Sequence, residues 1–355
     1  MDQHALQALT DDGLCAAVPG VTPGQARVLL SSVHRGRPLA ARPGLSRAAL
    51  DRVMSRAHVP GLEVIDERAS SRDAFRKYLL ATADGHRIEC VRIPLERPGR
   101  LSVCVSSQVG CALACRFCAT GRLGLLRNLE AWEIVEQVRI VRRGLPGDQR
   151  IHGVVFQGMG EPLANLDRVV AAIDVLTAPY AQAIDARAIT VSTAGLAPGI
   201  RRLAREAPRV RLALSLGSAR QEIRERIIPI ARAHPLDELI EAGVEHARAT
   251  GLAPLWAITL LAGVNDTPAD ARAMATLAAA FASRAGFPPE VSIIAYNSIG
   301  SGGDDPFAPS GPDVTAAFRT ELSAGGLRSH RRYSGGSDID AGCGQLAARR
   351  PGAPG

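Results

Sequence analysis

The spacing of apolar positions changes along the chain and divides it into parts. Up to about residue 60, apolar residues follow helical spacing in TPGQARVLLSSVHRG and LSRAALDRVMSRA, which the breaker ARPG separates. Further on, AFRKYLLA and HRIECVRIP alternate polar with apolar residues on either side of a DG turn signal, which predicts a β-hairpin. We therefore expect a helical accessory domain over residues 1–65 and a β-hairpin linker over residues 66–100.

From Leu101 onwards, short apolar strands alternate with amphipathic helical segments. The predicted strands are SVCVSS, HGVVFQ, AITVST, VRLALSL, LWAITLL and VSIIAY. This alternation predicts a parallel sheet, and six units rather than eight predict an α/β fold with a partial (β/α)6 barrel over residues 101–347. Catalytic residues are expected at the carboxyl ends of its strands. A Gly- and Pro-rich loop after Gly300 leads to a C-terminal extension, and we expect residues 348–355 to be disordered.

Charge adds a partner class to this picture. The 355-residue chain has a net charge of +7, and Lys77 is its only lysine, so arginine carries nearly all the positive charge. Genomic base composition explains the choice of arginine over lysine, but the sign of the charge favours a polyanion such as nucleic acid. The same excess of arginine suits phosphate, which a guanidinium can bind with two hydrogen bonds.

Three further observations bear on where the protein is located. The chain has no run of about 18 uncharged apolar residues, so we expect no membrane span. Its first residues, MDQHALQALTDDG, carry acids instead of the basic start of a secretory signal. The seven cysteines are odd in number and clustered, which fits a reducing compartment better than a disulfide scaffold. We therefore expect a cytoplasmic protein.

Three cysteines follow the first predicted barrel strand with C-x3-C-x2-C spacing. Cys111, Cys115 and Cys118 stand in GCALACRFCATG. Three thiolates on one loop can bind three irons of a 4Fe–4S cluster and leave the fourth iron open for chemistry. A structural zinc site normally has four protein ligands, and no histidine lies between Ser102 and Ile151. The spacing therefore favours an open cluster over zinc, and zinc over a chance grouping.

Five motifs lie within residues 70–347: CVSSQVGCALACRFCATG, GMGEPLAN, STAG, GVND and DIDAGCGQLA. Together they resemble the RlmN/Cfr family of radical S-adenosylmethionine (SAM) RNA adenine methyltransferases. The resemblance implies that the three cysteines bind a 4Fe–4S cluster and that its open iron binds SAM. Further SAM contacts are implied at Gly160, Glu161, Ser192, Ser215, Leu216, Gly217 and Asn297.

The resemblance also assigns catalytic roles to three residues outside the cysteine triad. It implies that Cys343 carries the methyl group, that Cys104 releases the product through a transient disulfide, and that Glu89 accepts a proton. The polar, Gly-flanked surroundings of Cys343 independently predict an exposed, reactive thiol. Taken alone, Cys104 is typical of a strand core and Glu89 of a solvated hairpin face. Cys15 and Cys90 receive no role.

The implied reaction methylates a ring carbon of an adenosine, with C2 expected, through an S-methylcysteine intermediate and with two SAM molecules per turnover. The implied partners are RNA (23S rRNA, with tRNA as a further substrate left open) and a reductant such as flavodoxin or ferredoxin. We expect a monomer.

Other functions stay open at this point. The chain departs from the family pattern at Gly217 and at Ala295–Tyr296, so another RNA target or another ring carbon such as C8 remains an alternative. A radical SAM enzyme acting on a small molecule or peptide would share the cluster but would not need both Cys104 and Cys343. A non-catalytic zinc protein that binds RNA would explain the charge and the cysteines, but not the motifs at the strand ends.

Overall fold

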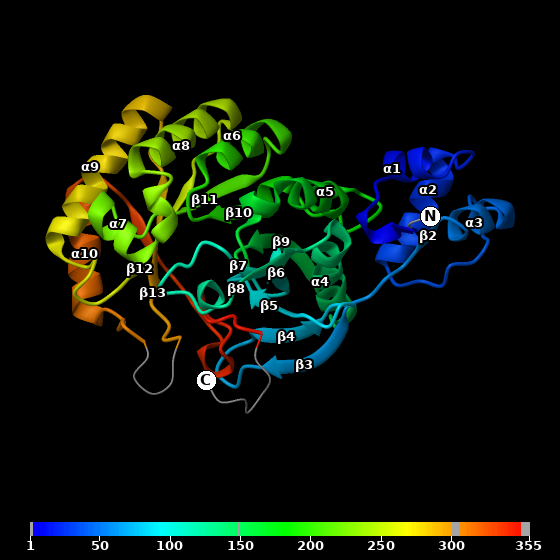
Figure 1. The fold of residues 1–355 in the computed structure, drawn as a ribbon, viewed down its shortest axis with the longest axis horizontal. Helices are drawn as coiled ribbons and strands as arrows, with labels where there is room; N and C mark the ends of the chain where they lie inside the picture. The colour runs from blue at the N-terminus through cyan, green and yellow to red at the C-terminus, as the bar shows by residue number, and fades with distance from the viewer. Residues whose placement is uncertain (1–2, 148, 300–304, 349–355) are drawn as a thin grey trace.

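A ten-stranded sheet forms the centre of the computed structural model, which describes residues 3–147, 149–299 and 305–348 (Figure 1). From one edge to the other, its strands are β14 (Ser329–Arg332), β13 (Glu290–Ala295), β12 (Leu255–Leu260), β11 (Arg211–Ser215), β10 (Ile189–Thr193), β9 (Arg150–Phe156), β6 (Arg100–Cys104), β5 (Arg87–Pro94), β4 (Arg76–Ala81) and β3 (Glu63–Ala69). Except for its first residue, the tail expected to be disordered (348–355) lies outside the described residues.

The strands from β14 to β6 pair in parallel, and β5, β4 and β3 continue the sheet with antiparallel pairing. The six predicted strands correspond to β6 and β9–β13, and the predicted partial (β/α)6 barrel is confirmed. These strands consist of nearly continuous apolar runs because helices or other core residues cover both faces of a parallel sheet. In β13, for example, Val291, Ile293 and Ile294 are all buried.

Helices connect the parallel strands and lie along the outer side of the sheet in Figure 1. They are α4 (Ala131–Arg143), α5 (Leu166–Thr177), α6 (Ala197–Glu206), α7 (Gln221–Ile227), α8 (Leu236–Thr250), α9 (Pro268–Ala285) and α10 (Pro312–Ala324). Short 3-10 helices are η1 (Leu6–Ala8), η2 (Thr120–Arg122), η3 (Pro162–Asn165), η4 (Ala186–Ala188), η5 (Pro229–Arg232) and η6 (Ser337–Ile339). No helix in the part of the chain that the structure describes is both long and apolar enough to span a membrane.

The ends of α9 illustrate how local sequence sets these helices. The Thr267 hydroxyl accepts a hydrogen bond from the Asp270 N–H, and the Asp270 carboxylate accepts one from the Thr267 N–H. This reciprocal capping satisfies N–H groups that have no partner within the helix, and Pro268 suits the first helical position. Gly286 ends the helix in the left-handed conformation that favours glycine, with φ 92°.

Residues 3–58 form an N-terminal module with a hydrophobic core of its own (Figure 1, blue). The module contains β1 (His4–Ala5), α1 (Asp11–Ala17), α2 (Pro23–His34), α3 (Arg47–Met54) and β2 (Ala57–His58). The two helices predicted from sequence are α2 and α3. The module rests on the barrel through Asp11, which accepts a hydrogen bond from the Tyr180 hydroxyl, and through Val33, whose carbonyl accepts one from Arg139 in α4.

The predicted hairpin is β4–β5, and it is continuous with the barrel sheet because β5 pairs with β6. The expected boundary between residues 65 and 66 falls inside β3, so the polypeptide enters the main sheet before that point. A second, separate hairpin of β7 (Gln108–Cys111) and β8 (Gly124–Asn128) follows β6. This β7–β8 hairpin encloses the cysteine loop.

Candidate active site at the carboxyl ends of the strands

A pocket opens at the carboxyl ends of the parallel strands and brings together residues from distant parts of the chain. Among its lining residues are Cys111, Cys115, Cys118, Gly160, Glu161, Ser192, Thr193, Ala194, Ser215, Gly217 and Cys343. The cysteine triad, five of the seven implied SAM contacts and the implied methyl carrier thus share one pocket. We call it the cluster pocket.

The cysteine loop is compact and tied to the barrel. Ala114 has a φ of 52°, a left-handed conformation that is uncommon for a residue other than glycine. The Cys118 N–H donates to the Cys115 carbonyl, and the Arg116 N–H donates to the Ile227 carbonyl at the end of α7, at 3.1 and 3.0 Å. The loop therefore presents its three thiols from a fixed backbone.

Burial makes these thiols poor anions without a positively charged partner. It raises the pKa of Cys111 to about 12, and it also raises the pKa values of Cys115 and Cys118. The thiols act on one another as well, since the charges of Cys111 and Cys118 raise the pKa of Cys115 further. Iron supplies the positive charge that stabilises thiolates in such a setting.

The donor set fits a 4Fe–4S cluster. Three half-buried thiols on one loop line the cluster pocket, and three thiolates can bind three irons and leave the fourth open. A structural zinc site is normally closed by four protein ligands.

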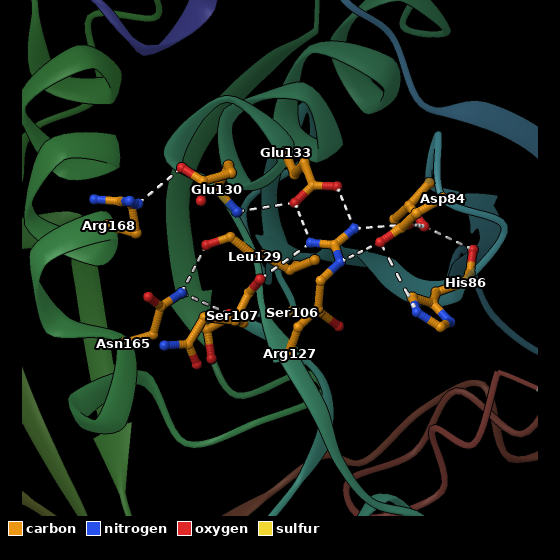
Figure 2. A network of polar contacts seen from close by, with 12 residues as sticks. Asp84, His86, Ser106, Ser107, Arg127, Leu129, Glu130, Glu133, Asn165 and Arg168 are labelled. Carbon is orange, nitrogen blue, oxygen red and sulfur yellow. Dashed lines mark hydrogen bonds and ion pairs between the residues drawn. The ribbon is translucent and has the colours of Figure 1, made fainter.

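A polar network fixes the hairpin that carries the triad, as Figure 2 shows. Arg127 on β8 donates to Asp84 beside β4 at 2.6 and 2.9 Å and to Glu133 on α4 at 2.8 and 2.9 Å. These hydrogen bonds hold the pKa of the Asp84 carboxyl well below its usual range. Asn165 donates to the Ser107 and Leu129 carbonyls, both at 2.8 Å. The β7–β8 hairpin is thereby joined to α4, to η3 and to the β4–β5 turn.

The GMGEP segment places Glu161 in the cluster pocket. Gly160 has a φ of 101°, and a Cβ at this position would lie 2.6 Å from the Cβ of Gln108, so the close approach of the two segments requires glycine. The Gln108 side chain accepts a hydrogen bond from the Glu161 N–H at 2.8 Å. Glu161 itself accepts backbone hydrogen bonds from Leu163 and Ala194 at 3.0 and 2.9 Å.

Burial raises the pKa of Glu161 to about 7, although the hydrogen bonds from Ala194, Leu163 and Thr193 act in the opposite direction. The carboxyl group is therefore poised between its two forms near neutral pH. A cationic amine in the pocket would favour the ionised form.

The remaining implied SAM contacts separate into two groups. The Ser192 and Ser215 hydroxyls lie 3.4 Å apart at the ends of β10 and β11, and Gly217 follows them on the pocket wall. Leu216 is fully buried and does not line the pocket. Asn297 does not line it either: its amide donates to the Ser334 hydroxyl at 2.9 Å and to the Cys343 carbonyl at 3.2 Å. Asn297 thus holds the chain around Cys343.

The C-terminal segment (residues 334–348) lies against the cysteine loop. The Ala119 N–H donates to the Gly344 carbonyl at 2.7 Å, and the Thr120 hydroxyl donates to the Leu346 carbonyl at 2.6 Å. Cys343 is half-buried in this arrangement, whereas its sequence surroundings predicted an exposed thiol. The sequence did not predict this burial, because the burial depends on contacts between residues far apart in the chain. The hydrogen bond from Thr120 to the Leu346 carbonyl, for example, spans 226 residues.

Cys104 and Cys343 line a second, smaller pocket together with Gln157 and Arg332, and Cys343 also lines the cluster pocket. Burial raises the pKa of Cys104 to about 12; nearby Cys343 raises it further and Arg332 lowers it. All seven cysteines are free thiols, so the implied disulfide is absent from this state.

Glu89 is buried rather than solvated, with an exposed fraction of 2%. One carboxylate oxygen pairs with Lys77 at 3.1 Å, and the other accepts the N–H groups of Ala347 and Ala348 at 2.8 and 3.0 Å. Lys77 also donates to the Asp340 carbonyl at 3.2 Å. The two side chains therefore hold the C-terminal segment on both sides of Cys343, and Glu89 does not line the cluster pocket.

Sequence reasoning missed Lys77 and the pocket-lining pair Thr193–Ala194. A signal existed for each. Lys77 is the one lysine in a chain that otherwise uses arginine, and the pair directly follows Ser192 in the STAG motif.

Comparisons with known proteins give the family of the chain. Residues 105–278 match the family described as the radical SAM superfamily. A protein of Sorangium cellulosum named "Probable RNA methyltransferase" is 55% identical, covering 95% of this chain and 92% of that protein. The "Probable dual-specificity RNA methyltransferase RlmN" of Moorella thermoacetica is 39% identical, covering 92% of each chain.

A solved structure has the same fold over nearly the whole chain. The crystal structure of a radical SAM methyltransferase from Sphaerobacter thermophilus has a TM-score of 0.86 and 35% sequence identity, covering 98% of this chain and all of that one. The similarity includes the N-terminal module, the barrel and the C-terminal segment. The chain belongs to the RlmN/Cfr family of radical SAM RNA methyltransferases.

Proposed function

We propose that this protein uses SAM and a 4Fe–4S cluster to methylate carbon C2 of an adenosine in RNA, with 23S rRNA as the expected substrate and tRNA as a second one. The observation that carries the proposal is the position of Cys343. Cys343 lines both the cluster pocket and the smaller pocket that Cys104 also lines. A radical SAM enzyme without a cysteine-bound methyl carrier has no need for this pair.

When bound, the cluster supplies an electron that cleaves SAM, and SAM supplies the methyl group and the radical that activates it. The Cys343 thiolate accepts a methyl group from one SAM molecule and later forms a carbon–carbon bond to adenine through that carbon. Cys104 then gives up its thiol proton and attacks the Cys343 sulfur. A sulfur–sulfur bond forms, the carbon–sulfur bond breaks, and the transferred carbon takes up a proton as the methylated base leaves. A cellular reductant such as flavodoxin or ferredoxin supplies electrons to reopen the disulfide.

Burial of Cys104 suits its proposed role as the thiol that releases the product, with Cys343 as the methyl acceptor. Because its pKa is raised to about 12, Cys104 stays a thiol at neutral pH and does not compete with Cys343 for the methyl group of SAM. Glu89 remains the proposed proton acceptor for the ring. Since its carboxylate accepts hydrogen bonds from Ala347 and Ala348, the C-terminal segment must move before Glu89 can accept that proton.

The proposed RNA partner is supported by unneutralised positive charge between the N-terminal module and the barrel. Arg35, Arg142 and Arg150 line one cavity there, and none of them pairs with a carboxylate of the described residues. Asp185, which also lines the cavity, pairs instead with Arg209 at 3.7 Å. Burial and the charges of Arg35 and Arg150 lower the pKa of Arg142. Such a group of guanidinium ions suits RNA phosphates, as an accessory RNA-binding domain requires.

Mass spectrometry of the protein tests the methyl carrier. Anaerobically reconstituted enzyme is incubated with methyl-deuterated SAM and digested, and the cysteine peptides are analysed. We expect a deuterated methyl group on Cys343, its loss in Cys343→Ala, and its retention in the matched control Cys15→Ala. Label on another cysteine, or on none, would contradict the proposal.

A further inference from the structure

Arg224, on α7, is a fully buried arginine whose charge has no evident partner. Its exposed fraction is 0%. One terminal nitrogen, Nη2, donates to the Ala194 carbonyl, while Nε and Nη1 have no hydrogen-bond partner among the residues that the structure describes. No Asp or Glu in those ranges forms an ion pair with it. This is unusual, because a buried charge is normally paired and its donors are normally satisfied.

The fold makes room for this guanidinium group. A Cβ on Gly195 would lie 2.7 Å from Nη2 of Arg224, and Gly195 has a φ of 127°. The glycine that ends the STAG motif thus lets the arginine approach the backbone behind the cluster pocket. A side chain at position 195 would displace Arg224.

The helix that carries Arg224 lies against the cysteine loop. The Arg116 N–H donates to the Ile227 carbonyl at the end of α7 at 3.0 Å, and Cys115 packs against the buried apolar cluster that includes Ile227 and Ile228. In keeping with this position, burial lowers the pKa of Arg224 to about 10 and Cys115 acts in the opposite direction.

Arg224 itself does not line the cluster pocket, but Ala194, whose carbonyl accepts its hydrogen bond, lines that pocket together with Cys115. A direct contact with SAM or with RNA therefore does not explain its charge. An anion bound by the cysteine loop does explain it.

We propose that Arg224 is the counter-ion of the iron–sulfur cluster. A 4Fe–4S cluster bound by three thiolates is an anion, and it becomes more negative when it accepts an electron. A fixed positive charge next to the cysteine loop stabilises both states, and the reduced state more, so it makes one-electron reduction easier. Arg224 acts through Cys115 and is a tuning residue, not a catalytic one. The inference rests on the cluster of the proposed function and not on its RNA substrate.

The test is a potentiometric titration of the reconstituted cluster, followed by electron paramagnetic resonance, with dithionite as the reductant. Arg224→Met removes the charge and keeps an unbranched side chain, and we expect its midpoint potential to be more negative than that of the wild type. Arg224→Lys keeps the charge and should lie closer to the wild type. Arg139→Met is the matched control, because Arg139 is also buried (4% exposed) but lies at the N-terminal module and pairs with Glu136. Its midpoint potential should be unchanged.

An unchanged midpoint in Arg224→Met overturns the inference. If Arg224→Met binds no cluster, the iron and sulfide content of Arg224→Lys decides: retention supports a role of the charge, and an equal loss shows a packing role only. A wild-type protein that binds no cluster would refute the proposed function itself, whereas a wild-type cluster with unshifted variants refutes only the role of Arg224.

Discussion

At the scale of single residues, burial decides how the groups of the site behave. Glu161 and Cys104 are both buried, and in both the charged form is disfavoured until a partner arrives. Their identities and motifs could be recognised from sequence. The burial of Glu89 and the contact of Asn297 with the Cys343 carbonyl could not, because both depend on where the C-terminal segment lies. Leu216 stands between two implied SAM contacts in sequence, but alternate residues of an extended chain face opposite sides, so it is buried away from the pocket.

Glu161→Gln is expected to change the pH dependence of stability in the protein without cluster. The pKa of Glu161 is raised from 4.5 to about 7, so between these values the folded state holds a proton that the unfolded chain releases. The stabilisation from this proton is complete below the unfolded-state pKa of 4.5 and is lost as the pH rises through the folded-state pKa of about 7. In this range the native state binds more protons than the unfolded state, so the free energy of unfolding falls as the pH rises. Between about pH 5 and about pH 8, the wild type should lose about 2 to 3 kcal/mol relative to the variant. Urea unfolding at both pH values measures this difference, and parallel pH profiles would contradict it.

At the scale of elements, the strands and helices follow from hydrophobic periodicity, and their joining follows from polar contacts. The six barrel strands and the hairpin β4–β5 were predictable because each carries its own apolar pattern. The edge strand β14 has the polar sequence SHRR, so its pairing with β13 is a tertiary effect. The docking of the C-terminal segment likewise depends on single polar side chains.

Arg127→Met should loosen the β7–β8 hairpin. It leaves the buried Glu133 carboxylate without its guanidinium partner, which we expect to lower the free energy of unfolding by about 2 kcal/mol. Arg168→Met is the control, because its ion pair with Glu130 is half exposed on both sides (50% and 53%) and should cost less than about 1 kcal/mol. Figure 2 shows both pairs. Equal losses in urea unfolding would show that the network does not stabilise the hairpin.

Glu89→Ala should release the C-terminal segment. The variant removes the acceptor of the Ala347 and Ala348 N–H groups, and we expect amide hydrogen exchange there to accelerate at least about tenfold. Glu67→Ala is the matched control, because its ion pair with Arg76 is exposed and lies on the neighbouring strands β3 and β4. Unchanged exchange over residues 340–348 would mean that Glu89 does not hold the segment.

At the scale of the whole molecule, a positively charged cavity lies between the N-terminal module and the barrel, while the candidate active site lies at the carboxyl ends of the strands. The net charge of +7 predicted an anionic partner but not where the charge gathers. Arg35 comes from the module and Arg142 and Arg150 from the barrel, so only the fold brings them to one cavity.

A double variant, Arg142→Gln with Arg150→Gln, should weaken RNA binding with little dependence on sequence. Each lost phosphate contact lowers the salt dependence of the logarithm of the binding constant by about 0.7 to 0.9. Fluorescence anisotropy with a labelled RNA hairpin at several salt concentrations measures this slope. Arg205→Gln with Arg248→Gln is the control, because both arginines are exposed, on α6 and α8, and do not line the cavity. Equal slopes for both double variants would contradict a role of the cavity.

The central claim is methyl transfer from Cys343 to an adenine carbon of RNA, and nucleoside mass spectrometry of RNA incubated with the reconstituted enzyme, SAM and a reductant tests it most directly. We predict 2-methyladenosine with the wild type and none with Cys343→Ala, although that variant still cleaves SAM. Wild-type product methylated at C8 would correct the ring carbon and keep the mechanism. Methyladenosine at the wild-type level from Cys343→Ala, or SAM cleavage by the wild type with no methylated RNA, would contradict the account.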